Sequence, residues 1–238
     1  MIPSQAFGFA LLATSFMGSY QAELKAGCKV ETLRACGEDY VPYGRGPTLP
    51  ASGKPLADIC VTWEQGLNCT YQFYDECLEG VPQVAAFIVI KGLQDNTASV
   101  CKVGSERNKE YEKTTPCLNT VGGKLHDCFR NFKDDVNRAL AKAPANEVIP
   151  HACCSYKDAL NCFDEALVPC ESIGGKRLFF AFFERALGNA VKLACPDHVA
   201  GSEACKSLQK LPPVGPQDRK IESYVEVLTE IASYISGQ

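Results

Sequence analysis

The chain has 238 residues, of which 14 are cysteine, and its formal net charge is −4. A slightly acidic chain has no bulk electrostatic attraction for phosphate backbones or anionic membranes, so nucleic-acid binding is disfavoured. Hydrophobic residues at 46% and charged residues at 22% are close to globular averages, so the chain can bury a core.

The first 22 residues are predicted to be a secretory signal peptide. This segment contains no charged side chain, and its apolar run over 6–16 has the length of a signal-peptide core. The alternative is a hydrophobic first helix of the mature fold. No stretch of the chain reaches the roughly 20 apolar residues that a transmembrane helix needs. We therefore expect a secreted, extracellular protein without a transmembrane segment, whose cysteines pair as disulfides.

Apolar residues of the first half recur at helical spacing. The predicted helices are 23–36, 56–77 and 84–100. A Pro- and Gly-rich stretch, 41–55, is predicted to be a long irregular connector. Taken alone, the apolar run 86–90 is also compatible with a short buried strand.

The second half follows the same plan. Its predicted helices are 117–142, 153–167 and 175–194, separated by Pro and Gly residues. After a Pro-rich linker that starts at residue 211, a last amphipathic helix is predicted over 217–236. This helix is expected to pack on the fold, and the alternative is a separate helix that binds a partner or dimerises.

The cysteines carry an internal repeat. Three of them recur at a constant offset of 93 residues (153 − 60 for the first pair), namely Cys60, Cys69 and Cys77 as Cys153, Cys162 and Cys170. Three further pairs recur at offsets of 89 to 94, namely Cys28 with Cys117, Cys36 with Cys128, and Cys101 with Cys195. Trp63 matches Tyr156 at the offset of 93, and Leu93 matches Leu187 at 94. A tandem duplication explains these matches.

Six cysteines in each copy leave Cys154 and Cys205 without counterparts. Both lie in the second copy, so they are predicted to pair with each other. Within each set of six cysteines, the sequence leaves all 15 connectivities open.

These patterns together predict an all-α, disulfide-stapled helical bundle. It consists of a three-helix, six-cysteine unit in tandem duplication, followed by a C-terminal amphipathic helix. The predicted segments are a signal peptide over 1–22, repeat 1 over 23–110, repeat 2 with the extra cysteine pair over 111–210, and a Pro-rich linker with the last helix over 211–238.

Candidate sites for polar chemistry are few. The three histidines, His126, His151 and His198, lie at no recognised metal-ligand spacing, and nearby thiols are better explained as disulfides. No nucleophile elbow, phosphate-binding loop or zinc-protease motif is present. We therefore expect no catalytic residue, no metal and no cofactor. Asn68 is a candidate glycosylation site, because Asn68-Cys69-Thr70 matches the acceptor pattern.

An aromatic run near the start of the third helix of repeat 2 is the candidate ligand site. A helix that is hydrophobic around nearly its whole surface is expected to be buried. Its phenylalanines either fill an ordinary core or line a cavity for an apolar ligand. The residues concerned are Phe179, Phe180, Phe182 and Phe183.

The cysteine spacing of repeat 2 resembles that of a known group of proteins. Cys162-x7-Cys170 is followed by 24 residues to Cys195 and then by Cys205, and the Cys153-Cys154 pair precedes a long amphipathic third helix. In these features the chain is similar to the cysteine-rich haemolymph glycoproteins of arthropods and related invertebrate secreted helical proteins. The resemblance implies an extracellular protein without enzymatic activity.

The leading expectation is a non-enzymatic binding or carrier protein for a small hydrophobic ligand. The first alternative is a structural component of an extracellular matrix, silk or secretion. The second is an inhibitor or venom-type protein that grips an extracellular protein through the exposed loop 41–55. The oligomeric state is left open.

Overall fold

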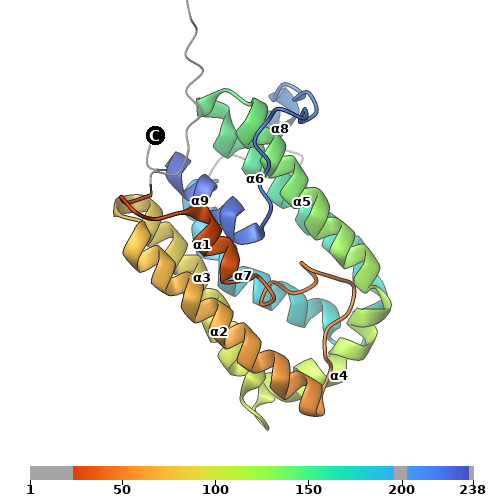
Figure 1. Ribbon diagram of the computed structural model, residues 1–238. Helices are drawn as coiled ribbons and strands as arrows, with labels where there is room; N and C mark the ends of the chain where they lie inside the picture. Colours follow the sequence, from red (N-terminus) through yellow and green to blue (C-terminus); the bar gives the residue numbers. More distant parts are fainter. Residues whose placement is uncertain (1–23, 196–202, 236–238) are drawn as a thin grey trace, which may run out of the picture.

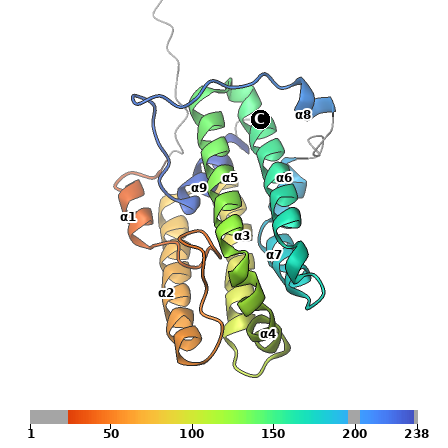
Figure 2. The ribbon, with the colours of Figure 1, turned by 90° about the vertical axis from the view of Figure 1, so that its right-hand side faces the viewer.

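The computed structural model describes residues 24–195 and 203–235, and the predicted signal peptide lies outside them. Within these residues all regular structure is helical, which confirms the all-α prediction. Figures 1 and 2 show long helices stacked side by side, with short helices α1 and α8 at the periphery.

Repeat 1 begins with a short helix and continues with a long antiparallel pair. Helix α1 (Val30–Ala35) is shorter than predicted, because Gly27 adopts a left-handed backbone (φ +91°) in the turn that precedes it. After the connector, α2 (Gly53–Cys77) and α3 (Gly80–Cys101) pack side by side (Figure 1). The apolar run 86–90 lies inside α3, so the strand alternative is wrong.

The segment that links the repeats contains two helices where one was predicted. Helix α4 (Glu106–Thr120) contains Pro116, and α5 (Gly122–Lys142) begins after a break at Val121. At the break, a Cβ on Gly122 would overlap the carbonyl oxygen of Pro47, so the connector can cross here only because residue 122 is glycine. The predicted boundary between residues 110 and 111 falls inside α4.

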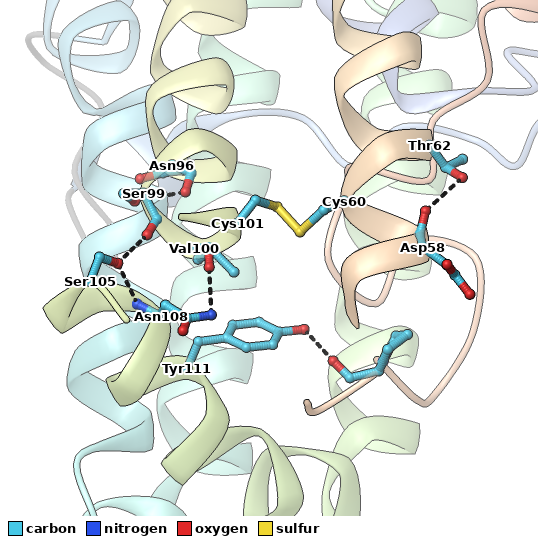
Figure 3. The surroundings of a disulfide bond; sticks show 11 residues. Asp58, Cys60, Thr62, Asn96, Ser99, Val100, Cys101, Ser105, Asn108 and Tyr111 are labelled. Carbon is cyan, nitrogen blue, oxygen red and sulfur yellow. Dashed lines mark hydrogen bonds between the residues drawn. A yellow bond between two sulfur atoms is a disulfide. The ribbon is translucent and has the colours of Figure 1, made fainter. Parts of the chain in front are cut away.

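The start of α4 is fixed by side chains. Ser105 Oγ accepts a hydrogen bond from the Asn108 backbone N–H, which is an N-cap. Asn108 Nδ2 donates to the Val100 carbonyl at the end of α3, beside the Cys60–Cys101 disulfide (Figure 3). These bonds turn the chain tightly from α3 into α4.

Repeat 2 continues with α6 (Val148–Ala166) and α7 (Gly175–Ala194). Helix α7 has the predicted bounds, whereas α6 begins five residues before the predicted start at residue 153, because Pro150 lies in its first turn, where proline is tolerated. Short 3₁₀ turns (Ala145–Glu147 and Val168–Cys170) precede and follow α6. A five-residue helix, α8 (Glu203–Ser207), had not been predicted.

The last helix, α9 (Tyr224–Ile235), packs among α1, α3, α5 and α6. Its residues Val225, Val227 and Ala232 are at most 3% exposed, so it is a core element and not a separate partner helix. It begins seven residues later than predicted. The Ile221 backbone N–H donates a hydrogen bond to Asn137 Oδ1 of α5, so this residue before α9 bonds to a side chain instead of to a helical carbonyl.

The disulfides follow the duplication. Repeat 1 contains three bonds, Cys28–Cys77, Cys36–Cys69 and Cys60–Cys101. Repeat 2 contains the corresponding three, Cys117–Cys170, Cys128–Cys162 and Cys153–Cys195. The seventh bond joins Cys154 to Cys205, the pair that the cysteine count leaves over. All 14 cysteines lie in the described segments and none is free.

The two repeats meet where α3 crosses α7. A Cβ on Gly92 would lie 2.5 Å from the Arg185 carbonyl oxygen and 2.7 Å from the Ala186 Cα, so the two backbones touch. Gly92 and Ala186 are equivalent at the offset of 94, so the crossing pairs a position with its own counterpart. Such self-pairing is the mark of a two-fold contact, here within one chain.

Candidate ligand-binding cavity

A cavity of about 130 Å³ lies beside the α3–α7 crossing. It is lined by side chains from α2 to α7, from α9 and from the connector. Its lining is predominantly apolar and aromatic. The residues on the repeat helices are Trp63, Val89, Leu93, Asn96, Thr97, Val100, Tyr111, Leu118, Phe129, Phe132, Tyr156, Ala159, Phe163, Leu178, Phe179, Phe182, Phe183, Ala186 and Leu187.

Equivalent positions of the two repeats face this cavity. Three matched pairs contribute to the lining, namely Trp63 with Tyr156, Val89 with Phe183, and Leu93 with Leu187. Because both members of each pair face the same space, that space lies close to the α3–α7 crossing, where Gly92 meets its counterpart Ala186. The cavity is therefore a product of the way the two repeats pack and does not belong to either repeat alone.

Three of the four predicted phenylalanines line the cavity. Phe179 and Phe183 stack with ring centroids 5.2 Å apart, and Phe182 lies under the Arg107 guanidinium at 5.6 Å. Phe180 is not part of the lining. It meets Phe179 edge-on and packs against the core of repeat 2.

The connector covers one side of the cavity and is held in place by hydrogen bonds to repeat 2. Asn119 accepts from the Leu49 N–H at 2.9 Å and donates to the Leu49 carbonyl at 2.8 Å. The Tyr43 hydroxyl donates to the same Asn119 oxygen at 3.1 Å. Tyr43 is 1% exposed, and burial raises the pKa of its hydroxyl. The part of the 41–55 connector that faces the cavity is therefore hydrogen-bonded to repeat 2 and partly buried, and is not an exposed loop.

Two buried polar atoms of cavity-lining residues have no hydrogen-bond partner. They are Trp63 Nε1, a donor, and Asn96 Oδ1, an acceptor. Trp63 is 6% exposed and Asn96 7% exposed. Asn96 Nδ2 donates to the Phe182 carbonyl at 2.9 Å, which fixes the orientation of the amide.

A second, polar cavity of about 270 Å³ lies between α1 and α9. Glu226 is fully buried there and accepts two hydrogen bonds from Arg34, at 2.9 and 3.0 Å. Arg219 contacts Glu226 at 3.2 Å and Glu230 at 2.6 Å. Paired carboxylates and guanidinium groups account for the polarity of this cavity.

The two histidines within the described residues, His126 and His151, do not gather into a site. His126 Nδ1 lies 2.7 Å from the Tyr43 carbonyl and helps to hold the connector. Burial lowers the pKa of His151, although Glu147 lies 3.9 Å away. His198 lies outside the described residues. No group of three or more potential metal-ligating side chains occurs in the segments that the structure describes.

Asn68 lies exposed on α2, and its Oδ1 accepts a hydrogen bond from Gln94 at 3.3 Å. The middle residue of the acceptor pattern, Cys69, is bonded to Cys36. Glycosylation of Asn68 stays a prediction, which its position within a helix makes less favourable. Among the helices in the described ranges, none is long and apolar enough to cross a membrane.

Comparison with known proteins finds no matching family model, no matching curated protein and no matching solved structure.

Proposed function

We propose that this is a secreted, non-enzymatic carrier of a small apolar molecule, which binds in the cavity between the two repeats. The observation that carries the proposal is the cavity itself. Sites for small molecules are typically concave and lined by apolar and aromatic side chains with a few polar groups, and this cavity has that character. Seven disulfides favour an oxidising compartment, which agrees with secretion.

The volume of the cavity limits the size of the ligand. An engineered apolar cavity of about 150 Å³ binds benzene, whereas pockets for drug-sized ligands have about 300–1,000 Å³. A cavity of about 130 Å³ therefore suits a ligand of one small ring or a short chain. A sterol or a long fatty acid would require the lining side chains to move.

The sole tryptophan of the chain provides a direct test, because Trp63 lines the cavity. Toluene titrated into the full mature protein should change the Trp63 fluorescence saturably, and calorimetry should give the same dissociation constant. Leu93→Phe should fill part of the cavity and weaken toluene binding about tenfold, while Val61→Phe, at a position 55% exposed on α2, should leave it unchanged.

Absence of saturable binding of toluene, and of its hydroxyl counterpart phenol, by a normally folded protein would exclude the carrier function. Equal weakening by Leu93→Phe and Val61→Phe would place the bound toluene outside the cavity.

A further inference from the structure

From the two unpartnered polar atoms we infer that the ligand of the cavity carries a hydroxyl group, so that its class is a small apolar alcohol or phenol. This inference rests on the proposed function and adds the chemistry of the ligand. Both atoms are fully buried in the free protein, so the lining side chains would shift on binding to let the hydroxyl accept a hydrogen bond from Trp63 Nε1–H and donate one to Asn96 Oδ1.

The energetic argument starts from the cost of leaving these atoms unpaired. A buried polar group without a partner costs about 1–3 kcal/mol, and most buried polar groups in folded proteins are therefore paired. Trp63 and Asn96 are both more than nine-tenths buried, and both line the same apolar cavity. If these two positions served only to fill the core, apolar side chains would fill it without the cost of unpaired polar atoms.

The two residues also lie at similar heights along the helix pair. The Cys60–Cys101 disulfide joins α2 to α3, and the helices run antiparallel. Trp63 lies three residues after Cys60, and Asn96 lies five residues before Cys101 (Figure 3 shows Asn96 and the bridge). At about 1.5 Å per residue, both are displaced from the bridge in the same direction, by distances that differ by about 3 Å.

The pairing of one donor with one acceptor selects the chemistry of the ligand. An indole N–H can only donate, and an amide oxygen can only accept. The hydrogen bond from Asn96 Nδ2 to the Phe182 carbonyl determines which end of the amide is this oxygen. A hydroxyl group both accepts and donates, so a single small group can satisfy both atoms. A ligand carbonyl would satisfy Trp63 alone, and a hydrocarbon would satisfy neither.

The test compares phenol with toluene, which differ by a hydroxyl in place of a methyl group. The measured quantity is the ratio of the toluene to the phenol dissociation constant, determined by calorimetry on the full mature protein. Asn96→Leu and Trp63→Phe should each lower this ratio about tenfold, because each removes one partner of the hydroxyl. Val89→Ala, which changes an apolar lining residue, should alter both dissociation constants by the same factor.

A second measurement needs no substitution. Trp63 is the only tryptophan, so its indole N–H gives a single identifiable NMR signal. Phenol should shift this proton signal downfield, as hydrogen bonding does, and toluene should not.

The outcomes separate the two proposals. If neither probe binds, both proposals fail. If toluene binds but the ratio is unchanged in Asn96→Leu and Trp63→Phe, or if phenol leaves the indole signal in place, the carrier proposal stands and the hydroxyl inference is overturned.

Discussion

At the level of single residues, Gly92 controls how closely the repeats can approach. A Cβ at this position would lie 2.5 Å from the Arg185 carbonyl oxygen, on a backbone that cannot move aside cheaply. We expect Gly92→Ala to destabilise the fold by about 1–3 kcal/mol, as overpacking does. Urea unfolding followed by circular dichroism measures this change.

Gly123 offers a matched control in another helix. No atom lies within 4 Å of the place where its Cβ would be, and the residue is helical. Gly123→Ala should therefore stabilise the protein by up to about 1 kcal/mol through its higher helix propensity. Destabilisation of equal size by both substitutions would show that the close crossing is not the cause.

The candidate site illustrates at the same scale what a sequence can and cannot reveal. The aromatic run in α7 pointed to Phe179, Phe182 and Phe183, because hydrophobicity around a whole helix indicates burial. It also included Phe180, because sequence alone does not tell which side of a buried helix faces a void. Trp63 was visible only as the repeat counterpart of Tyr156. Nothing in the sequence indicated that Asn96 would present an unpaired oxygen, because this depends on the hydrogen bond that its amide nitrogen makes to the Phe182 carbonyl of α7.

At the level of elements, the attachment of α9 depends on the buried carboxylate of Glu226. This group is 0% exposed and accepts hydrogen bonds from Arg34, Arg219 and the Glu222 backbone N–H. Glu226→Ala removes the buried carboxylate that both guanidinium groups share, leaving Glu222 beside Arg34 and Glu230 beside Arg219, so we expect a loss of about 3 kcal/mol in unfolding free energy.

The control for this substitution is Glu222→Ala, at a side chain that is 69% exposed and 3.2 Å from Arg34. An exposed ion pair contributes at most about 1 kcal/mol. Thermal unfolding of the two variants should therefore show a much lower midpoint for Glu226→Ala. Equal midpoints would mean that α9 is held by its apolar face alone.

The seventh disulfide should be the least important one for the core. Cys205 lies in α8, which contains no buried residue, whereas Cys153 is 3% exposed within a core cluster. We expect Cys154→Ala/Cys205→Ala to remain folded and ligand-competent. Cys153→Ala/Cys195→Ala should lose about 2–5 kcal/mol, as is typical for a native bridge. The unfolding midpoints of the two double variants compare these effects, and similar losses would contradict this ranking.

The elements themselves were largely predictable where periodicity was strong, as in α7, whose observed bounds equal the predicted ones. The errors lie where tertiary contacts decide. The break at Val121 depends on the connector crossing Gly122, and the late start of α9 depends on Asn137 holding Ile221. Neither contact is encoded in local sequence.

At the level of the whole molecule, burial of tyrosines should make the fold sensitive to alkali. Burial raises the pKa of five hydroxyls, those of Tyr40, Tyr43, Tyr74, Tyr111 and Tyr224, and raises that of Tyr156 to about 12. In the unfolded chain these groups ionise near pH 10. The unfolded state therefore releases protons first, so stability is unaffected well below pH 10 and falls as the pH rises above it.

Phenolate absorbance recorded together with helical circular dichroism tests this expectation. The six tyrosines whose pKa is raised by burial should stay protonated in the native protein near pH 10 and ionise together with the loss of helix. Titration of these six tyrosines near pH 10 with the helices intact would contradict their burial.

The confinement of the disulfides to single repeats has a mechanical consequence. The overlapping bridges of repeat 1 close the chain from Cys28 to Cys101, and those of repeat 2 close it from Cys117 to Cys205. Between them the chain takes 16 residue-to-residue steps (117 − 101), through residues 102–116, that no covalent cross-link shortens. Fully stretched at about 3.5 Å per residue, this tether spans about 56 Å. Under a pulling force, the contact between the repeats and α4 should yield first, while each repeat keeps its covalent loops closed.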